Sequence, residues 1–201
     1  MSQQSKQQPK QRETLIWAAA KLFRRQGYSG TGLRDILAAS GAARGSLYHY
    51  FPDGKEEIGA AAVAAAGGLV TDTFAELAKQ ADSPADFLRR YTGMLAHWLE
   101  ASKFRDGCPI TMTLLETTPA SAAITEAGQA VFADWLAVMA AMLARHDWPA
   151  ARIPATATAI IAGLEGALML ARVLRSTQPI HDTTWALCVM LEMSDVDPGG
   201  A

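Results

Sequence analysis

Basic and aromatic side chains are interleaved near the N-terminus of the 201-residue sequence, where Arg44 is followed by Tyr48, His49 and Tyr50. This combination is typical of proteins that bind nucleic acids, because cations neutralise phosphates and polar-tipped rings add hydrogen bonds. Residues 1–52 hold eight Lys and Arg but two acidic residues, a net charge of +6, which leaves −8 for the rest of a chain whose total is −2. A basic head on an acidic body predicts a polyanionic partner for the head alone.

The sequence lacks the residue spacings typical of disulfide frameworks, metal sites and the common catalytic motifs. Cys108 and Cys188 lie 80 positions apart and form no CxxC pair, which indicates a reducing cytoplasm and no disulfide framework. No histidine follows a glutamate by three positions, as a di-iron bundle requires, and no HExxH, Walker A, GxSxG or GxGxxG motif occurs. We therefore expect no catalytic residue, no metal and no cofactor.

We interpret no segment of the sequence as membrane-spanning. The N-terminal residues are basic and rich in glutamine, so we expect a flexible arm over residues 1–10 and neither a signal peptide nor an anchor. The most apolar long segment, residues 153–171, carries Glu165 in its middle, a costly place for a carboxylate in lipid. We expect a cytoplasmic protein without membrane contact.

Three short helices would position the basic head. With 39 alanines and few β-branched runs, the composition predicts an all-helical fold. Apolar spacing predicts helices over residues 11–26, over about two turns after an N-cap at Thr31, and over residues 44–51. The same criteria predict longer helices over residues 55–80, 84–101, 120–146, 155–174 and 183–193, and a short one between Pro109 and Pro119.

The first three helices have the pattern of a helix-turn-helix DNA reader, in which a tight glycine turn separates the second helix from the third. Gly41 stands where this turn needs a positive φ angle. The inward positions are apolar or small: Ile36, Ser40, Ala42, Leu47 and Tyr50. A generic helical hairpin is the alternative. The pattern predicts a DNA-binding domain over residues 11–54.

Several short motifs resemble the TetR family of bacterial transcriptional repressors: residues 18–23, Gln26-Gly27-Tyr28, Thr31, Asp35-Ile36, Ser40-Gly41 and residues 45–51. The stretches 51–57 and 108–110 are similar to its LmrA/YxaF-like branch. The resemblance implies a dimer whose third helix enters the major groove. It also implies that residues 55–201 form a helical domain that dimerises, binds a small molecule and alters the spacing of the two heads.

The resemblance places Arg44 where family members approach bases, and a guanidinium there can contact O6 and N7 of guanine. Gly45 would allow close approach to DNA, and Lys55 would contact a phosphate. Tyr48 and His49 suit phosphate oxygens, although Tyr48 could pack between helices and His49 could be a solvated surface residue. The predicted DNA-binding set is Thr31, Arg34, Ala43, Arg44, Gly45, Ser46, Tyr48, His49, Tyr50 and Lys55.

The body carries many large, soft side chains that could line a lipophilic cavity. Ordinary core packing is the alternative for each of them, surface exposure for Glu116, and an inert buried thiol for Cys108. The predicted ligand-binding set is Phe87, Tyr91, Met94, Trp98, Cys108, Met112, Leu115, Glu116, Phe132, Trp135, Met139, Glu165 and Met169.

Small residues along 155–167, followed by Trp185, Leu187, Val189 and Leu191, resemble the family's four-helix dimer seam, with packing inside one subunit as the alternative. We therefore predict a repressor that binds a pseudo-palindromic operator on double-stranded DNA as a homodimer and is released by a small lipophilic effector. The alternatives are a ligand-independent architectural DNA-binding protein and a helical-bundle enzyme.

Overall fold

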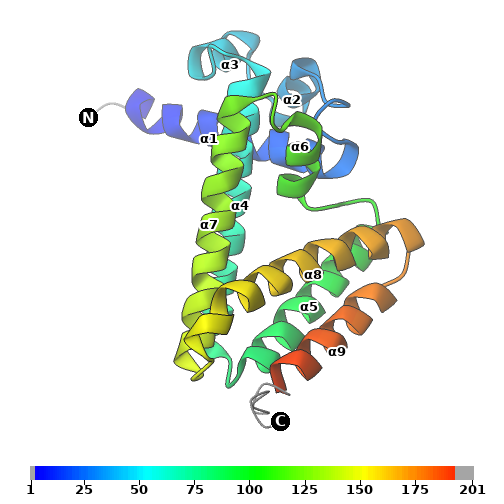
Figure 1. The fold of residues 1–201 in the computed structure, drawn as a ribbon. Helices are drawn as coiled ribbons and strands as arrows, with labels where there is room; N and C mark the ends of the chain where they lie inside the picture. Colours follow the sequence, from blue (N-terminus) through cyan, green and yellow to red (C-terminus); the bar gives the residue numbers. More distant parts are fainter. Residues whose placement is uncertain (1–2, 193–201) are drawn as a thin grey trace, which may run out of the picture. The chain divides into compact units, whose positions relative to one another are not determined.

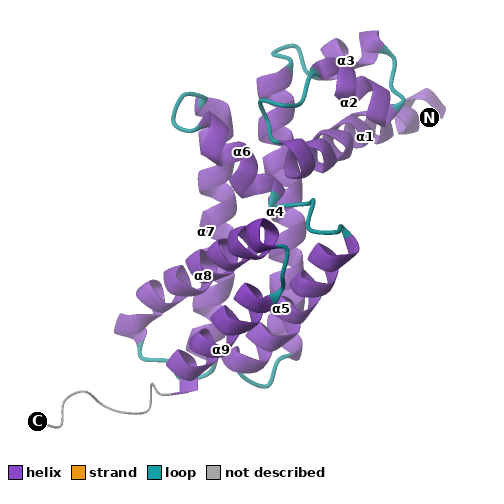
Figure 2. Cartoon of the chain, turned by 90° about the vertical axis from the view of Figure 1, so that its right-hand side faces the viewer, coloured by secondary structure: helices purple, strands orange, loops and turns teal. Residues whose placement is uncertain are grey.

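The computed structural model describes residues 3–192, and all secondary structure in that range is helical (Figures 1 and 2). The all-helical prediction is confirmed. In chain order the elements are α1 (Gln3–Gln26), α2 (Leu33–Ser40), α3 (Arg44–Tyr50), α4 (Lys55–Gln80), α5 (Pro84–Ala101), α6 (Pro109–Thr117), α7 (Ala122–Arg145), the 3-10 turn η1 (Ala150–Arg152), α8 (Ile153–Leu174) and α9 (Gln178–Glu192).

Several predicted boundaries differ from the structure, and three of them have a clear physical reason. α1 begins at Gln3 rather than at residue 11, because glutamine and lysine favour helix, and residues 1–2 lie outside the described residues. The flexibility of the arm stays a prediction. The N-cap of α2 is Gly32 rather than Thr31, and the Asp35 carboxylate accepts a hydrogen bond from its N–H at 2.8 Å. α9 begins at Gln178, because Pro179 fits a first helical turn, where no N–H is needed, instead of preceding the helix.

The chain forms two compact units that do not coincide with the boundary predicted after residue 54. Among the described residues, the first contains 3–69 together with 108–132, and the second contains 70–107 and 133–192. α6 and the start of α7 therefore belong with the predicted DNA-binding domain. The reason is packing, since α6 lies against α1.

In the first unit, α2 and α3 are joined by the predicted turn. Gly41 has φ 67°, the left-handed conformation expected of it, and its N–H bonds to the carbonyl of Leu37 at 3.0 Å. Ile36, Leu47 and Phe51 are fully buried. These three side chains fix one face of the α2–α3 pair and leave the opposite face to solvent.

The core of the second unit contains an aromatic cluster around Phe74 of α4. Its ring centroid lies 5.8 Å from that of Phe87, 4.7 Å from Tyr91 and 5.7 Å from Trp135, each pair approaching edge to face. Edge-to-face pairs at such distances add to the free energy of burial. Phe74 thereby joins α4 to α5 and α7.

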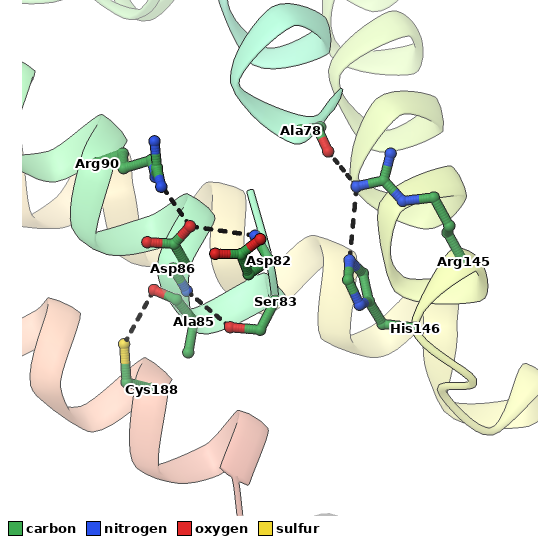
Figure 3. A network of polar contacts seen from close by, with 9 residues as sticks. All are labelled: Ala78, Asp82, Ser83, Ala85, Asp86, Arg90, Arg145, His146 and Cys188. Atoms are coloured by element: carbon green, nitrogen blue, oxygen red, sulfur yellow. Dashed lines mark hydrogen bonds and ion pairs between the residues drawn. The ribbon is translucent and has the colours of Figure 1, made fainter. Parts of the chain in front are cut away.

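Side chains hold the turn between α4 and α5 by satisfying its free backbone groups (Figure 3). Ser83 caps α5, with Oγ accepting from the N–H of Asp86 at 3.1 Å. The Asp86 carboxylate accepts from the N–H of Asp82 at 3.1 Å and from Arg90 at 2.8 Å, and these bonds lower the pKa of Asp86.

Two neighbouring helices bond to the same region (Figure 3). The guanidinium of Arg145 on α7 donates to the carbonyl of Ala78 near the end of α4. The thiol of Cys188 on α9 lies 3.7 Å from the carbonyl oxygen of Ala85, and burial raises the pKa of that thiol.

Three segments, α4, α7 and residues 150–174, are long and apolar enough to cross a membrane by length and composition alone. In the structure their apolar side chains also supply protein core, for example Phe74, Trp135 and Ile160. Of the most apolar window in each segment, 39%, 33% and 39% respectively is buried inside the structure.

The Phe74 cluster makes a stability prediction. Phe74→Ala should lower the free energy of unfolding by about 3 to 5 kcal/mol, because it removes a buried ring from three aromatic neighbours. Denaturant titration at fixed protein concentration measures the loss. Leu69→Ala, on the same helix but 57% exposed, is the control and should cost less than about 1 kcal/mol. Equal effects of the two substitutions would contradict the assigned role of the cluster.

Candidate nucleic-acid interface

The exposed face of α3 carries the groups suited to reading DNA. Arg44, Gly45 and His49 are exposed, and Tyr48 exposes 50% of its surface. His49 also makes an edge contact with Tyr50, with ring centroids 4.9 Å apart. A Cβ added to Gly45 would meet nothing within 4 Å, so the backbone there is open to close approach by a ligand.

The remaining predicted residues of this region fall into two groups. Arg34 on α2 and Ala43, the N-cap of α3, are exposed. Ser46 and Tyr50 are half-buried, so their side chains also contribute to packing. The guanidinium of Arg12 lies 5.1 Å from the centroid of the Phe51 ring, which adds a cation from α1 to this unit.

Thr31 does not lie where the sequence prediction placed it. Its side chain is fully buried, and its Oγ1 donates to the carbonyl of Gly27 at 2.8 Å. The hydroxyl is therefore engaged inside the turn between α1 and α2 and is not presented to a phosphate. A threonine suits this buried turn position because its methyl group packs while its hydroxyl bonds to a nearby backbone carbonyl.

Lys55, the predicted phosphate contact, lies half-buried at the first position of α4. Its Nζ stands 4.2 Å from the ring centroid of Tyr28, a cation–π contact. Desolvation lowers the pKa of Lys55, and the nearby Glu116 carboxylate opposes this effect. The Lys55 ammonium thus already contacts the Tyr28 ring. A phosphate contact by Lys55 stays a prediction.

Glu116 was assigned to the ligand set by sequence, and the structure places it against the turn between α1 and α2. Its carboxylate accepts from the backbone N–H of Tyr28 at 3.1 Å and of Ser29 at 2.6 Å. Sequence reasoning missed both partners. The available signal was a lone acidic residue in an otherwise neutral and largely apolar α6.

The other predicted ligand residues are distributed over both units. Phe87, Trp135 and Met139 are buried in the second unit, which favours ordinary core packing for them. Met94, Leu115 and Met169 are exposed by 52%, 76% and 58%. The half-buried members are Tyr91, Trp98, Cys108, Met112, Phe132 and Glu165.

A cavity of about 230 Å³ opens in the second unit between the α4–α5 turn, the segment after α7 and the end of α9. Trp148, Pro84 and Leu191 supply its apolar wall, and His146, Asp147 and Glu192 its polar one. None of the predicted ligand residues lines it. Within residues 3–192, no group of three or more His, Cys, Asp or Glu side chains is placed to hold a metal ion.

Comparison with known proteins identifies relatives of both parts of the chain. Residues 15–62 match the family described as bacterial regulatory proteins, tetR family, and residues 84–184 match the transcriptional regulator LmrA/YxaF-like C-terminal domain. The HTH-type transcriptional regulator LmrA of Bacillus subtilis is 29% identical over 169 residues, which cover 84% of this chain and 90% of the relative.

The uncharacterized HTH-type transcriptional regulator YxaF of the same species is 30% identical over 169 residues, covering 84% of this chain and 88% of the relative. A solved TetR transcriptional regulator from Chloroflexus aurantiacus is similar in fold, with a TM-score of 0.79 and 27% identity over 94% of this chain and 98% of that one. The likeness extends across both units.

The open space at Gly45 leads to a prediction for DNA affinity. Gly45→Ala should leave the free energy of unfolding unchanged or raise it by up to about 1 kcal/mol, because alanine favours helix. The same methyl group should weaken DNA binding, since it stands on the surface that would approach the duplex. Gly93→Ala is the matched control, because a Cβ there also meets nothing within 4 Å, and it should not change DNA affinity. Unchanged affinity in Gly45→Ala, measured by fluorescence anisotropy, would contradict the close approach.

Proposed function

Since the chain belongs to the TetR family of bacterial transcriptional regulators, we propose that it is a repressor that binds a pseudo-palindromic operator as a homodimer. A small lipophilic effector releases it. The cytoplasm, where bacterial DNA lies, is its place of action. Because the relatives are transcriptional regulators, a helical-bundle enzyme is not proposed.

The observation that carries this proposal is that α3 has one buried apolar side and one exposed side with basic and aromatic residues. Leu47 is fully buried against the rest of the first unit, while Arg44 and Tyr48 stand on the exposed side. Arg44 is also the first residue of the helix, and N-terminal residues of a recognition helix contact base edges. The arrangement supports reading by Arg44 through O6 and N7 of guanine.

An apolar stripe on α8 supports the homodimer. Met169, Leu170, Val173 and Leu174 are exposed, by 58%, 48%, 75% and 63%, and Trp185 on α9 by 70%. The four α8 residues share one face because they are spaced by three or four positions, and such an exposed apolar face is typical of an interface. A second copy of this chain is the occupant we propose. Other residues of the predicted seam pack internally, since Leu187 and Leu191 are buried and a Cβ on Gly163 would touch Leu187.

The operator proposal is tested by selecting duplexes from a random library with the full chain. The selected sequence should be pseudo-palindromic, and sedimentation should find two chains on one duplex. Arg44→Ala should then cost about 1 to 3 kcal/mol on the selected duplex and little on random DNA. Lys79→Ala, which removes an exposed cation from the second unit, should change neither affinity.

Three outcomes would count against this proposal. A library that yields no enriched sequence would contradict sequence-specific binding. One chain per duplex would contradict the dimer. Equal losses on selected and random DNA would reassign Arg44 from a base to a phosphate.

The effector distinguishes the repressor from a ligand-independent architectural DNA-binding protein. It is proposed because the LmrA/YxaF-like match covers the helical body, which carries the predicted ligand residues. An effector acts only through its difference in affinity for the DNA-bound and free conformations, so DNA and effector must weaken each other's binding by the same factor.

A panel of uncharged aromatic compounds tests this coupling. A compound that raises the melting temperature of the free protein should weaken binding to the selected duplex by about 5- to 150-fold, and the duplex should weaken binding of the compound equally. Fluorescence anisotropy and calorimetry measure the two factors. A compound that binds saturably yet leaves duplex affinity unchanged would favour the architectural alternative.

A further inference from the structure

The turn between α1 and α2, residues 27–32, is held partly by its own groups. The buried Thr31 hydroxyl bonds to the carbonyl of Gly27 at 2.8 Å, and the Thr31 N–H bonds to the carbonyl of Tyr28 at 3.1 Å. The N–H groups of Tyr28 and Ser29 find their partner on another helix. Both donate to Glu116, 88 and 87 positions away in the sequence.

The carboxylate of Glu116 occupies space that a side chain at position 27 would need. A Cβ added to Gly27 would overlap the Oε1 atom of Glu116. Gly27 also has φ +81°, a conformation that other L residues rarely adopt. Two independent features of this glycine, its dihedral angle and its missing Cβ, thus allow the carboxylate to reach the backbone of the turn.

The side chain of Tyr28 is held by other elements of the same unit. Its ring centroid lies 5.2 Å from that of Phe23 on α1 and 4.2 Å from the Nζ of Lys55 on α4. A Cβ on Gly59 of α4 would lie 2.9 Å from the ring. Tyr28 is therefore fixed through its backbone by α6 and through its ring by α1 and α4.

The charges of this cluster are complementary. Burial acts to raise the pKa of Glu116, but hydrogen bonds from Ser29 and Tyr28 and the nearby Lys55 outweigh it, so the pKa lies below the ordinary value of a glutamate. The carboxylate is therefore ionised at neutral pH and can accept both hydrogen bonds.

We propose that Glu116 is a positioning residue for DNA reading, because it fixes the turn from which α2 and then α3 begin. The inference rests on the proposed function, since it assigns to α6 a role in setting operator affinity. Loss of the carboxylate leaves two backbone N–H groups of the turn without their acceptor, and the entry into α2 loses its fixed orientation.

This role predicts a loss of affinity that is larger than the loss of stability. Glu116 and Ser29 are both exposed, so water can replace the carboxylate at the freed N–H groups. Water cannot restore the orientation of the turn in the same way, and contacts to bases depend on how α3 is placed in the groove. A merely structural residue would instead lower the melting temperature and leave the ratio of selected to random DNA affinity unchanged.

The experiment compares Glu116→Gln and Glu116→Ala with wild type, using the full chain and the duplex that wild type selects. Glutamine keeps one acceptor oxygen and alanine keeps none. We expect affinity for the selected duplex to fall in that order, by at least about fivefold for alanine, with affinity for random DNA and the melting temperature nearly unchanged. Glu126→Gln, an equal loss of charge at an exposed position of α7 in the same unit, should bind as wild type does.

Hydrogen exchange supplies a readout that does not involve DNA. The amides of Tyr28 and Ser29 should exchange faster in Glu116→Ala than in wild type, while those in the middle of α1 should not. Unchanged exchange at both amides would overturn the proposal.

A double-mutant cycle tests the same contact from the side of the turn. Gly27→Ala should weaken binding to the selected duplex in wild type, because its methyl group displaces the carboxylate. In the Glu116→Ala background the same change should weaken binding less, since only the strain at φ +81° remains. Additive effects would overturn the contact between the two positions.

The outcomes separate this inference from the proposed function. If wild type selects no sequence, both are overturned. If wild type selects a duplex and Glu116→Ala binds it with unchanged affinity, the proposed function stands and the positioning role of Glu116 is overturned.

Discussion

A helix of seven residues is not stable in water by itself, and α3 therefore depends on its buried side chains. Leu47 within the helix and Phe51 directly after it are fully buried, as is Ile36 on α2, and both α2 and α3 pack against α1. This small core sets which side of α3 faces solvent. The positions of Arg44, Tyr48 and His49 follow from it, so the chemistry of the exposed face is decided by apolar residues on the opposite one.

The turn before α2 depends on contacts that are distant in sequence. Its buried Thr31 hydroxyl donates to the carbonyl of Gly27, and Glu116 on α6 accepts from the N–H groups of Tyr28 and Ser29. The first unit is consequently more than a helix-turn-helix with a linker. It includes α6 and the beginning of α7. Within this unit, the carboxylate of Glu116 on α6 bonds to the turn between α1 and α2.

Local signals in the sequence were sufficient for most of the fold. Lys55–Gln80 and Pro84–Ala101 were predicted to the residue, because Gly54, Ser83 and Pro84 mark where these helices begin. The family resemblance placed Arg44 at the start of the third helix, where it is exposed; Tyr48, for which packing between helices was the alternative, is exposed as well. The bond from Glu116 to the turn and the aromatic cluster around Phe74 could not be predicted, because periodicity within one helix carries no information about which distant element it meets.

The two stretches of chain that form the first unit, residues up to 69 and 108–132, have a consequence for how such a protein can change. An exchange by recombination of residues 1–54 alone would bring a new turn but keep the resident α6, so Glu116 would face a backbone it did not evolve with. Point substitutions at the solvent side of α3 disturb neither the small core nor the turn. Under the proposed function, single substitutions on that face would therefore change the recognised DNA sequence with less disturbance of the fold than a transplant of residues 1–54 between relatives.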